Sequence, residues 1–104
     1  MREYESLVIL DPSADEAEYD KIVGKVEDAI AKSGGTLSFT DRWGKRRMTY
    51  EIRKSREGYY VLFAFKSNAA FLAELEKLYR FTPFVMRAMT TLALPEKYRV
   101  RKAE

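Results

Sequence analysis

Apolar and polar residues alternate with two different periods along this chain. Residues 4–10 are rich in β-forming side chains and continuously apolar in their second half. Such a run predicts a strand that is covered on both faces. The Asp11-Pro12 pair that follows predicts a turn after this strand.

After this turn the apolar positions recur at helical spacing, which predicts an amphipathic helix. Ser13 is the expected N-cap, because Glu16 follows it at the spacing of a capping box. The pair Gly34-Gly35 is expected to end the helix. The predicted core positions of this helix are Tyr19, Ile22, Val23, Val26 and Ile30.

The next apolar residues change parity within one predicted strand. A strand whose inward face changes parity needs one extra residue, and Gly44 is the natural place for such a β-bulge. The apolar positions are odd before this glycine and even after it: Leu37 and Phe39, then Met48, Tyr50 and Ile52.

The second half of the chain repeats the order of the first. Residues 54–58 predict a hairpin loop, and residues 59–65 predict a strand. Asn68 is expected to cap a second helix, and Pro83 is expected to end it. Residues 85–92 predict a last strand. The apolar positions of the second helix are Phe71, Leu72, Leu75, Leu78 and Tyr79.

This order of strand, helix, strand, strand, helix and strand predicts an α+β fold. Two βαβ halves give the ferredoxin-like βαββαβ sandwich, a four-stranded antiparallel sheet with two helices on one face. We expect a single domain over residues 1–94 and a charged C-terminal tail over residues 95–104. The fold hosts many unrelated functions and does not by itself assign one.

Composition argues against catalysis. The chain has no histidine, the usual general base near neutral pH, and no cysteine nucleophile or thiolate ligand. We therefore expect no enzyme, no metal, no cofactor and no small-molecule substrate. An enzyme or ligand sensor on the same fold would need a pocket with convergent polar groups. No segment predicts a membrane span or a signal peptide, and the absence of cysteine is compatible with the cytoplasm.

Charge is distributed unevenly along the chain. Residues 1–33 carry four lysines and arginines against nine acidic residues, whereas residues 41–66 carry eight against three. Residues 43–54 contain five lysines and arginines on a strand expected at the sheet edge. Charges at an edge also prevent aggregation between sheets. Three consecutive cations beside a bulge are better explained by contact with phosphate groups, which favours binding to nucleic acid.

The face of the sheet away from the helices is the second candidate surface. If Tyr60, Leu62 and Ala64 face the helices, the alternate residues of that strand lie on the open face. Residues 57–63 resemble the signature of an RNA-recognition motif, but Glu57 replaces a cation and Val61 replaces a stacking aromatic. An aliphatic open face favours a protein partner, and cover by the C-terminal tail is the alternative.

Residues 44–53 read Gly-Lys-Arg-Arg-Met-Thr-Tyr-Glu-Ile-Arg and resemble the signature of the bacterial small-subunit ribosomal protein six family. The resemblance extends over residues 1–93, including residues 1–5, 10–12, 57–60 and 85–87. Met48 stands in place of leucine, Thr49 in place of serine or alanine, and Glu51 in place of a frequent proline.

The resemblance implies a cytoplasmic, ribosome-bound structural protein. It would bind the central domain of small-subunit ribosomal RNA together with small-subunit ribosomal protein eighteen. A stand-alone RNA-binding module is the alternative. The residues expected to contact ribosomal RNA are Arg2, Lys45, Arg46, Arg47, Arg53, Lys54 and Arg87. The residues expected to contact the partner protein are Leu7, Ile9, Tyr59, Val61, Phe63, Phe65 and Tyr98.

Overall fold

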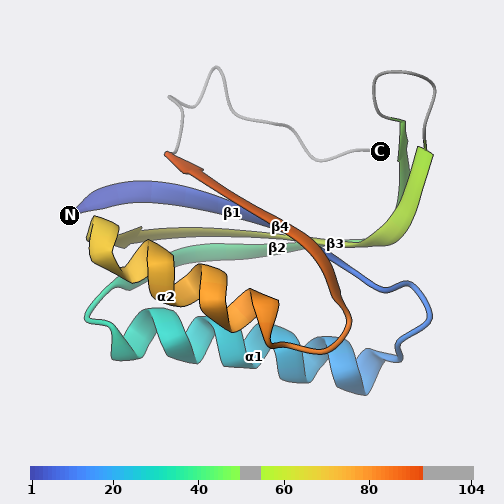
Figure 1. The fold of residues 1–104 in the computed structure, drawn as a ribbon, viewed down its shortest axis with the longest axis horizontal. Coiled ribbons are helices and arrows are strands. Elements are labelled where there is room, and N and C mark those ends of the chain that lie inside the picture. Colours follow the sequence, from blue (N-terminus) through green and yellow to red (C-terminus); the bar gives the residue numbers. More distant parts are fainter. Residues whose placement is uncertain (50–54, 93–104) are drawn as a thin grey trace.

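The computed structural model describes residues 1–49 and 55–92, and it confirms the predicted order of elements (Figure 1). The predicted tail, with Tyr98, and the two cations Arg53 and Lys54 lie outside the described residues, so the predicted domain division stays a prediction. The elements are β1 (Arg2–Leu10), α1 (Glu16–Lys32), β2 (Thr36–Thr49), β3 (Ser55–Ser67), α2 (Ala69–Arg80) and β4 (Val85–Leu92).

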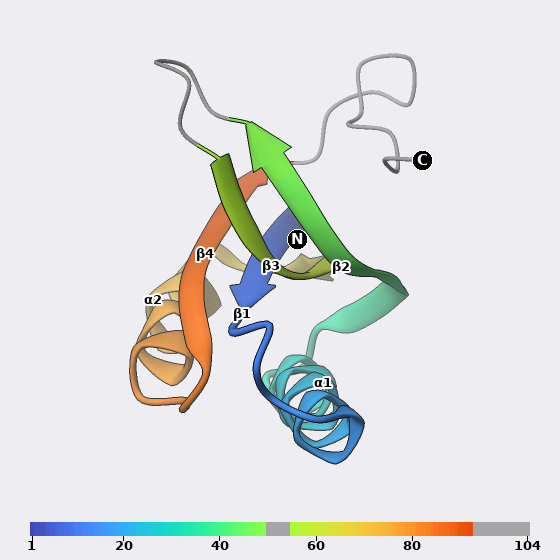
Figure 2. The ribbon, with the colours of Figure 1, turned by 90° about the vertical axis from the view of Figure 1, so that its right-hand side faces the viewer.

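The four strands form one antiparallel sheet in the order β2-β3-β1-β4. Both helices lie on the same side of this sheet, as Figures 1 and 2 show. This arrangement is the predicted ferredoxin-like sandwich. It leaves β2 and β4 as the two edge strands, which confirms the edge position expected for the basic strand.

The main core lies between the sheet and the helices. All five predicted core residues of α1 are buried there, and α2 contributes Phe71, Leu75 and Tyr79. On the other face of the sheet a smaller cluster joins Ile9, Trp43, Tyr60 and Leu62, with Leu7 packed against it.

The prediction of which β3 side chains face the helices is wrong. Tyr59, Val61, Phe63 and Phe65 belong to the helix-covered core, whereas Tyr60 and Leu62 lie on the open face. The reason is the pairing with β1, in which Leu7 is opposite Leu62 and Ile9 is opposite Tyr60. Residues that are directly opposite in neighbouring strands share a face, so Leu7 and Ile9 fix the parity of β3.

Gly44 is a bulge residue, as predicted. The pairing of β2 with β3 shifts between Arg42 and Gly44, and Gly44 has a φ of 83°. That left-handed conformation is inexpensive only for glycine. A second shift between Leu37 and Phe39 was not predicted. Because of it, these two residues lie on opposite faces of the sheet.

The hairpin loop predicted over residues 54–58 is too long. Ser55 to Gly58 are part of β3, and the ladder continues to the pair Thr49 and Ser55. The β2–β3 hairpin therefore extends past the end of the helices as a two-stranded arm, which Figures 1 and 2 show bending away from the helix layer. We call residues 45–49 and 55–58 the hairpin arm.

The cap of α1 differs from the prediction. Asp15 is the N-cap, and its carboxylate accepts a hydrogen bond from the Glu18 N–H at 2.9 Å. The N–H and hydroxyl of Ser13 instead donate to the Asp11 carboxylate, which lowers the pKa of Asp11. Asn68 caps α2 as predicted, accepting from the Phe71 N–H at 3.1 Å.

Replacing Asp15 with alanine should lower the free energy of unfolding by about 0.5–2 kcal/mol, because the Glu18 N–H loses its acceptor at a helix N-terminus. Ser13→Ala should cost less, since it leaves this cap intact. Denaturant titration of both variants provides the measurement. A larger loss for Ser13→Ala would identify Ser13 as the effective cap after all.

Candidate nucleic-acid interface

Three consecutive cations lie on the edge strand immediately after the bulge. Lys45 is paired with Tyr59, Arg46 with Gly58, and Arg47 with Glu57. Side chains alternate along a strand, so Arg46 lies on the open-face side and Lys45 and Arg47 on the other. The hairpin arm therefore presents positive charge on both of its faces.

These three cations differ in how accessible they are. Lys45 and Arg47 are exposed, and Arg46 is half-buried. Arg47 contacts the Glu57 carboxylate at 3.4 Å, and 70% of its side-chain surface remains exposed. Exposed ion pairs of this kind contribute about 0–1 kcal/mol, so a phosphate group can replace the carboxylate at little cost.

The two outlying predicted cations lie in different places. Arg87 is opposite Ile9, which is opposite Tyr60, which is opposite Gly44. This row of paired residues crosses the sheet and puts Arg87 on the open face. Neighbouring strands are about 4.8 Å apart, so Arg87 lies about 14 Å from Gly44 at the other end of the row. Arg2 is exposed and pairs with Ser67 at the far end of the sheet. The structure does not bring Arg2 together with the hairpin arm.

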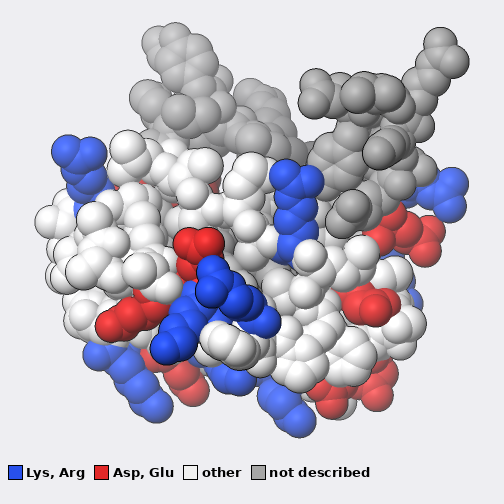
Figure 3. Space-filling view, in the orientation of Figure 1, with Lys and Arg blue, Asp and Glu red and all other residues white. Residues whose placement is uncertain are grey.

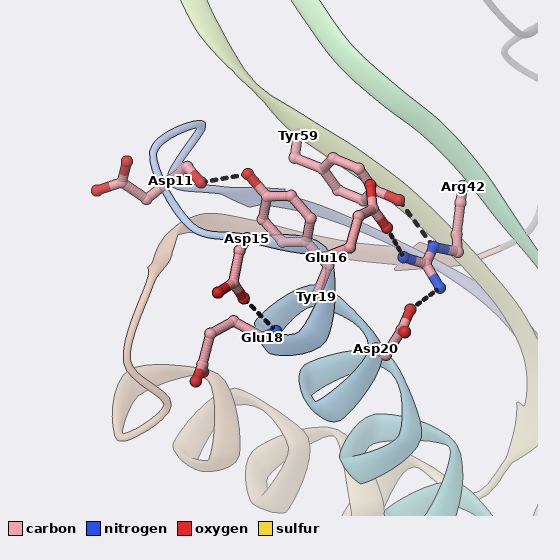
Figure 4. A network of polar contacts seen from close by, with 8 residues as sticks. All are labelled: Asp11, Asp15, Glu16, Glu18, Tyr19, Asp20, Arg42 and Tyr59. Carbon is pink, nitrogen blue, oxygen red and sulfur yellow. Dashed lines mark hydrogen bonds and ion pairs between the residues drawn. The ribbon is translucent and has the colours of Figure 1, made fainter.

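Arg42, just before the bulge, was not predicted as a site residue and has a different environment (Figure 4). Its Nη1 donates to the Asp20 carboxylate at 2.7 Å, and its Nη2 donates to the Glu16 carboxylate at 3.2 Å. Its Nε donates to the Tyr59 hydroxyl at 2.8 Å. The hydrogen bond to Asp20 raises the pKa of Arg42 above its ordinary value. We call Glu16, Asp20, Arg42 and Tyr59 the Arg42 cluster.

Tyr59 extends the Arg42 cluster into the core. Its ring stacks on Tyr19 of α1 with the centroids 3.9 Å apart, and the guanidinium carbon of Arg42 lies 5.6 Å from its centroid. The Tyr19 hydroxyl in turn donates to the Asp11 carbonyl at 2.7 Å. Burial raises the pKa of Tyr19. The edge strand is thus tied to α1 at the position before the bulge.

The open face next to the hairpin arm is apolar. Trp43 lies nearly parallel to Tyr60, with the ring centroids 6.2 Å apart, and its Nε1 donates to the Asp41 carboxylate at 3.2 Å. Phe39 and Met89 are exposed at the two edge strands, opposite Ala64 and Leu7. Between them Leu7 is half-buried, and Ile9 is buried.

The predicted partner-binding residues therefore divide into two groups. Leu7 and Ile9 lie on the open face, where they were expected. The remaining described members lie on the helix-covered face, where a partner on the open face cannot reach them: Tyr59, Val61, Phe63 and Phe65.

Cations and carboxylates are interspersed over the face of the molecule seen in Figure 3. A mixture of this kind does not generate a strong field of one sign. Among the described residues, the run of three cations on β2 is therefore the more distinctive feature for a polyanion. None of the helices in the described ranges has the length and apolar character needed to cross a membrane.

Sequence reasoning missed Arg42 because its partners are distant in the chain. Asp20 and Glu16 are 22 and 26 residues away, and no local pattern links them to β2. The available signal was compositional: an acidic first half of α1 and a cation directly before the expected bulge.

Comparison with known proteins agrees with this architecture. The family model for ribosomal protein S6 matches residues 3–91. The small ribosomal subunit protein bS6 of Clostridium novyi is 44% identical over 97 residues, covering 93% of this chain and all of that protein. The corresponding protein of Clostridium botulinum, strain Loch Maree, is 43% identical and covers 86% of this chain and 95% of its own length.

A solved structure supports the same assignment, and a second one shares the fold. The crystal structure of 30S ribosomal protein S6 from Thermotoga maritima has a TM-score of 0.78 and 35% identity, covering 88% of this chain and 87% of that one. The C-terminal domain of the MgtC protein from Mycobacterium tuberculosis has a TM-score of 0.61 at 12% identity, which shows a shared fold alone. The family match and these relatives together show that the chain belongs to the ribosomal protein S6 family of the small ribosomal subunit.

Proposed function

We propose that this chain is a structural, non-catalytic protein that binds the central domain of small-subunit ribosomal RNA through the hairpin arm. The observation that carries the proposal is the run of three cations on an edge strand directly after a glycine bulge. Arginine donates paired hydrogen bonds to phosphate oxygens, and each neutralised phosphate releases counterions into solution. The expected site of action is the ribosome in the cytoplasm.

The proposed protein partner is small-subunit ribosomal protein eighteen, docked on the open sheet face. Exposed apolar side chains at both ends of this face, Phe39 and Met89, support such a surface. A net charge of only +3 gives the chain alone little general attraction for RNA, so a partner that extends the positive surface would strengthen binding. A stand-alone RNA-binding module would need no such partner.

The double variant Arg46→Ala/Arg47→Ala should weaken binding to a transcript of the central domain. Two phosphate contacts are lost, so the slope of log affinity against log salt should fall by about two. Titrations at several salt concentrations, with equimolar partner present, measure this slope. The single variant Arg47→Ala should change thermal stability little, because its charge is exposed and such charges contribute little to stability.

Lys21→Ala/Lys25→Ala is the matched control, since it removes the same charge from α1. It should leave the slope close to that of the parent. Equal losses in both double variants would mean that RNA responds to net charge alone, and the proposed interface would be wrong.

A further inference from the structure

The side chain of Arg42 is bound by groups of its own chain, so it is not available to contact RNA. All three nitrogen atoms of its guanidinium group donate hydrogen bonds, two of them to carboxylates of α1 and one to the Tyr59 hydroxyl. Only 30% of its side-chain surface is exposed. A planar guanidinium fixed at three points defines the orientation of the strand that carries it, which a lysine ammonium cannot do.

This cluster lies at the root of the hairpin arm. Trp43 and Gly44 follow Arg42 directly, and the pairing register shifts at this point. A bulge bends the strand and increases its twist, so it sets the direction of everything beyond it. Arg42 anchors the strand on the helix side of the bulge, and the packing of Trp43 on Tyr60 anchors it on the open side. The cations at residues 45–47 begin immediately after these anchors.

We propose that Arg42 is a positioning residue for RNA binding: the Arg42 cluster fixes the direction of the hairpin arm, and with it the geometry of its cations. The inference rests on the proposed function of that arm. In this proposal Asp20 and Glu16 support RNA binding indirectly, by holding Arg42, although as carboxylates they would otherwise only repel phosphate. Without the cluster the arm remains paired, but RNA must select one of several arm directions, and this selection lowers the affinity.

Asp20→Ala gives this proposal a test in which charge and positioning have opposite effects. The variant raises the net charge by one, so simple electrostatics predicts tighter binding to RNA. Positioning predicts weaker binding, by about threefold or more, the scale found for residues coupled in one network. Asp28→Ala is the control, because Asp28 is an exposed carboxylate of the same helix and its loss changes the charge equally. It should bind the same central-domain transcript as tightly as the parent or more tightly.

Arg42→Lys provides a second variant in which net charge is constant. A lysine cannot reach both carboxylates and the Tyr59 hydroxyl, so this variant should also weaken binding. The sole tryptophan, Trp43, reports on the arm independently of RNA. Its fluorescence should change in Asp20→Ala and Arg42→Lys but not in Asp28→Ala.

The outcomes separate the two proposals. If Asp20→Ala binds RNA as tightly as the parent or more tightly, or Arg42→Lys retains full affinity, Arg42 is not a positioning residue. Either result overturns the inference even when Arg46→Ala/Arg47→Ala loses affinity as expected. If that double variant loses nothing, the proposed RNA interface itself is wrong.

Discussion

Replacing Phe63 with alanine should lower the free energy of unfolding by about 3–5 kcal/mol, the usual cost of removing a buried phenylalanine ring. Phe63 lies in the middle of β3, only 1% exposed, in the core between the sheet and the helices. The substitution removes apolar contacts and leaves a cavity that the packed strand cannot close. Chemical denaturation followed by circular dichroism measures the loss.

Phe81→Ala is the control with the same chemistry. Phe81 follows α2 and is 70% exposed, so its loss should cost less than about 1 kcal/mol. A small effect at Phe63, comparable to that at Phe81, would mean that this side chain is not in the core. The assignment of the faces of β3 would then have to be reversed.

The face of β3 shows where sequence reasoning failed. Residues 59–65 are apolar at every position, so alternation carries no information about which side faces the helices. The information lies in the pairing with β1, which is a contact between residues about fifty or more positions apart. The position of the strand could be read from its composition, whereas its register could not.

Local signals were more reliable. The Gly44 bulge followed from a change of parity within one strand, and the Asn68 cap followed from a polar residue before an amphipathic segment. The cap of α1 failed because Ser13 and Asp15 are both good N-caps, and the choice depends on where Asp11 forms its turn. The capping-box spacing could not distinguish them.

The candidate site also combines a part that could be predicted from the sequence with a part that could not. The cations at residues 45–47 are consecutive, so the sequence displays them as a group and only their exposure had to be established. The cluster around Arg42 joins an edge strand to the first turns of a helix, and it becomes visible only when the sheet is assembled (Figure 4). Tertiary pairing of charges therefore determines which cations are available for phosphate.

The largest effect on the proposed partner is expected from a charge on the open face. Met89→Asp should weaken binding of small-subunit ribosomal protein eighteen by at least about 2 kcal/mol, roughly thirtyfold, because a carboxylate would be desolvated against apolar groups. Met89 is 47% exposed and opposite Leu7, so the variant should still fold.

Leu92→Asp is the matched control on the same edge strand. Leu92 is 49% exposed but opposite Tyr4, whose side chain belongs to the helix-covered core, so it lies on the other face of the sheet. Titration calorimetry with the purified partner should show strong loss for Met89→Asp and nearly parental affinity for Leu92→Asp. The reverse pattern would place the partner on the helix side of β4. If both variants bind the partner as tightly as the parent, the open face is not the docking surface, because burying a carboxylate at an apolar interface costs binding free energy.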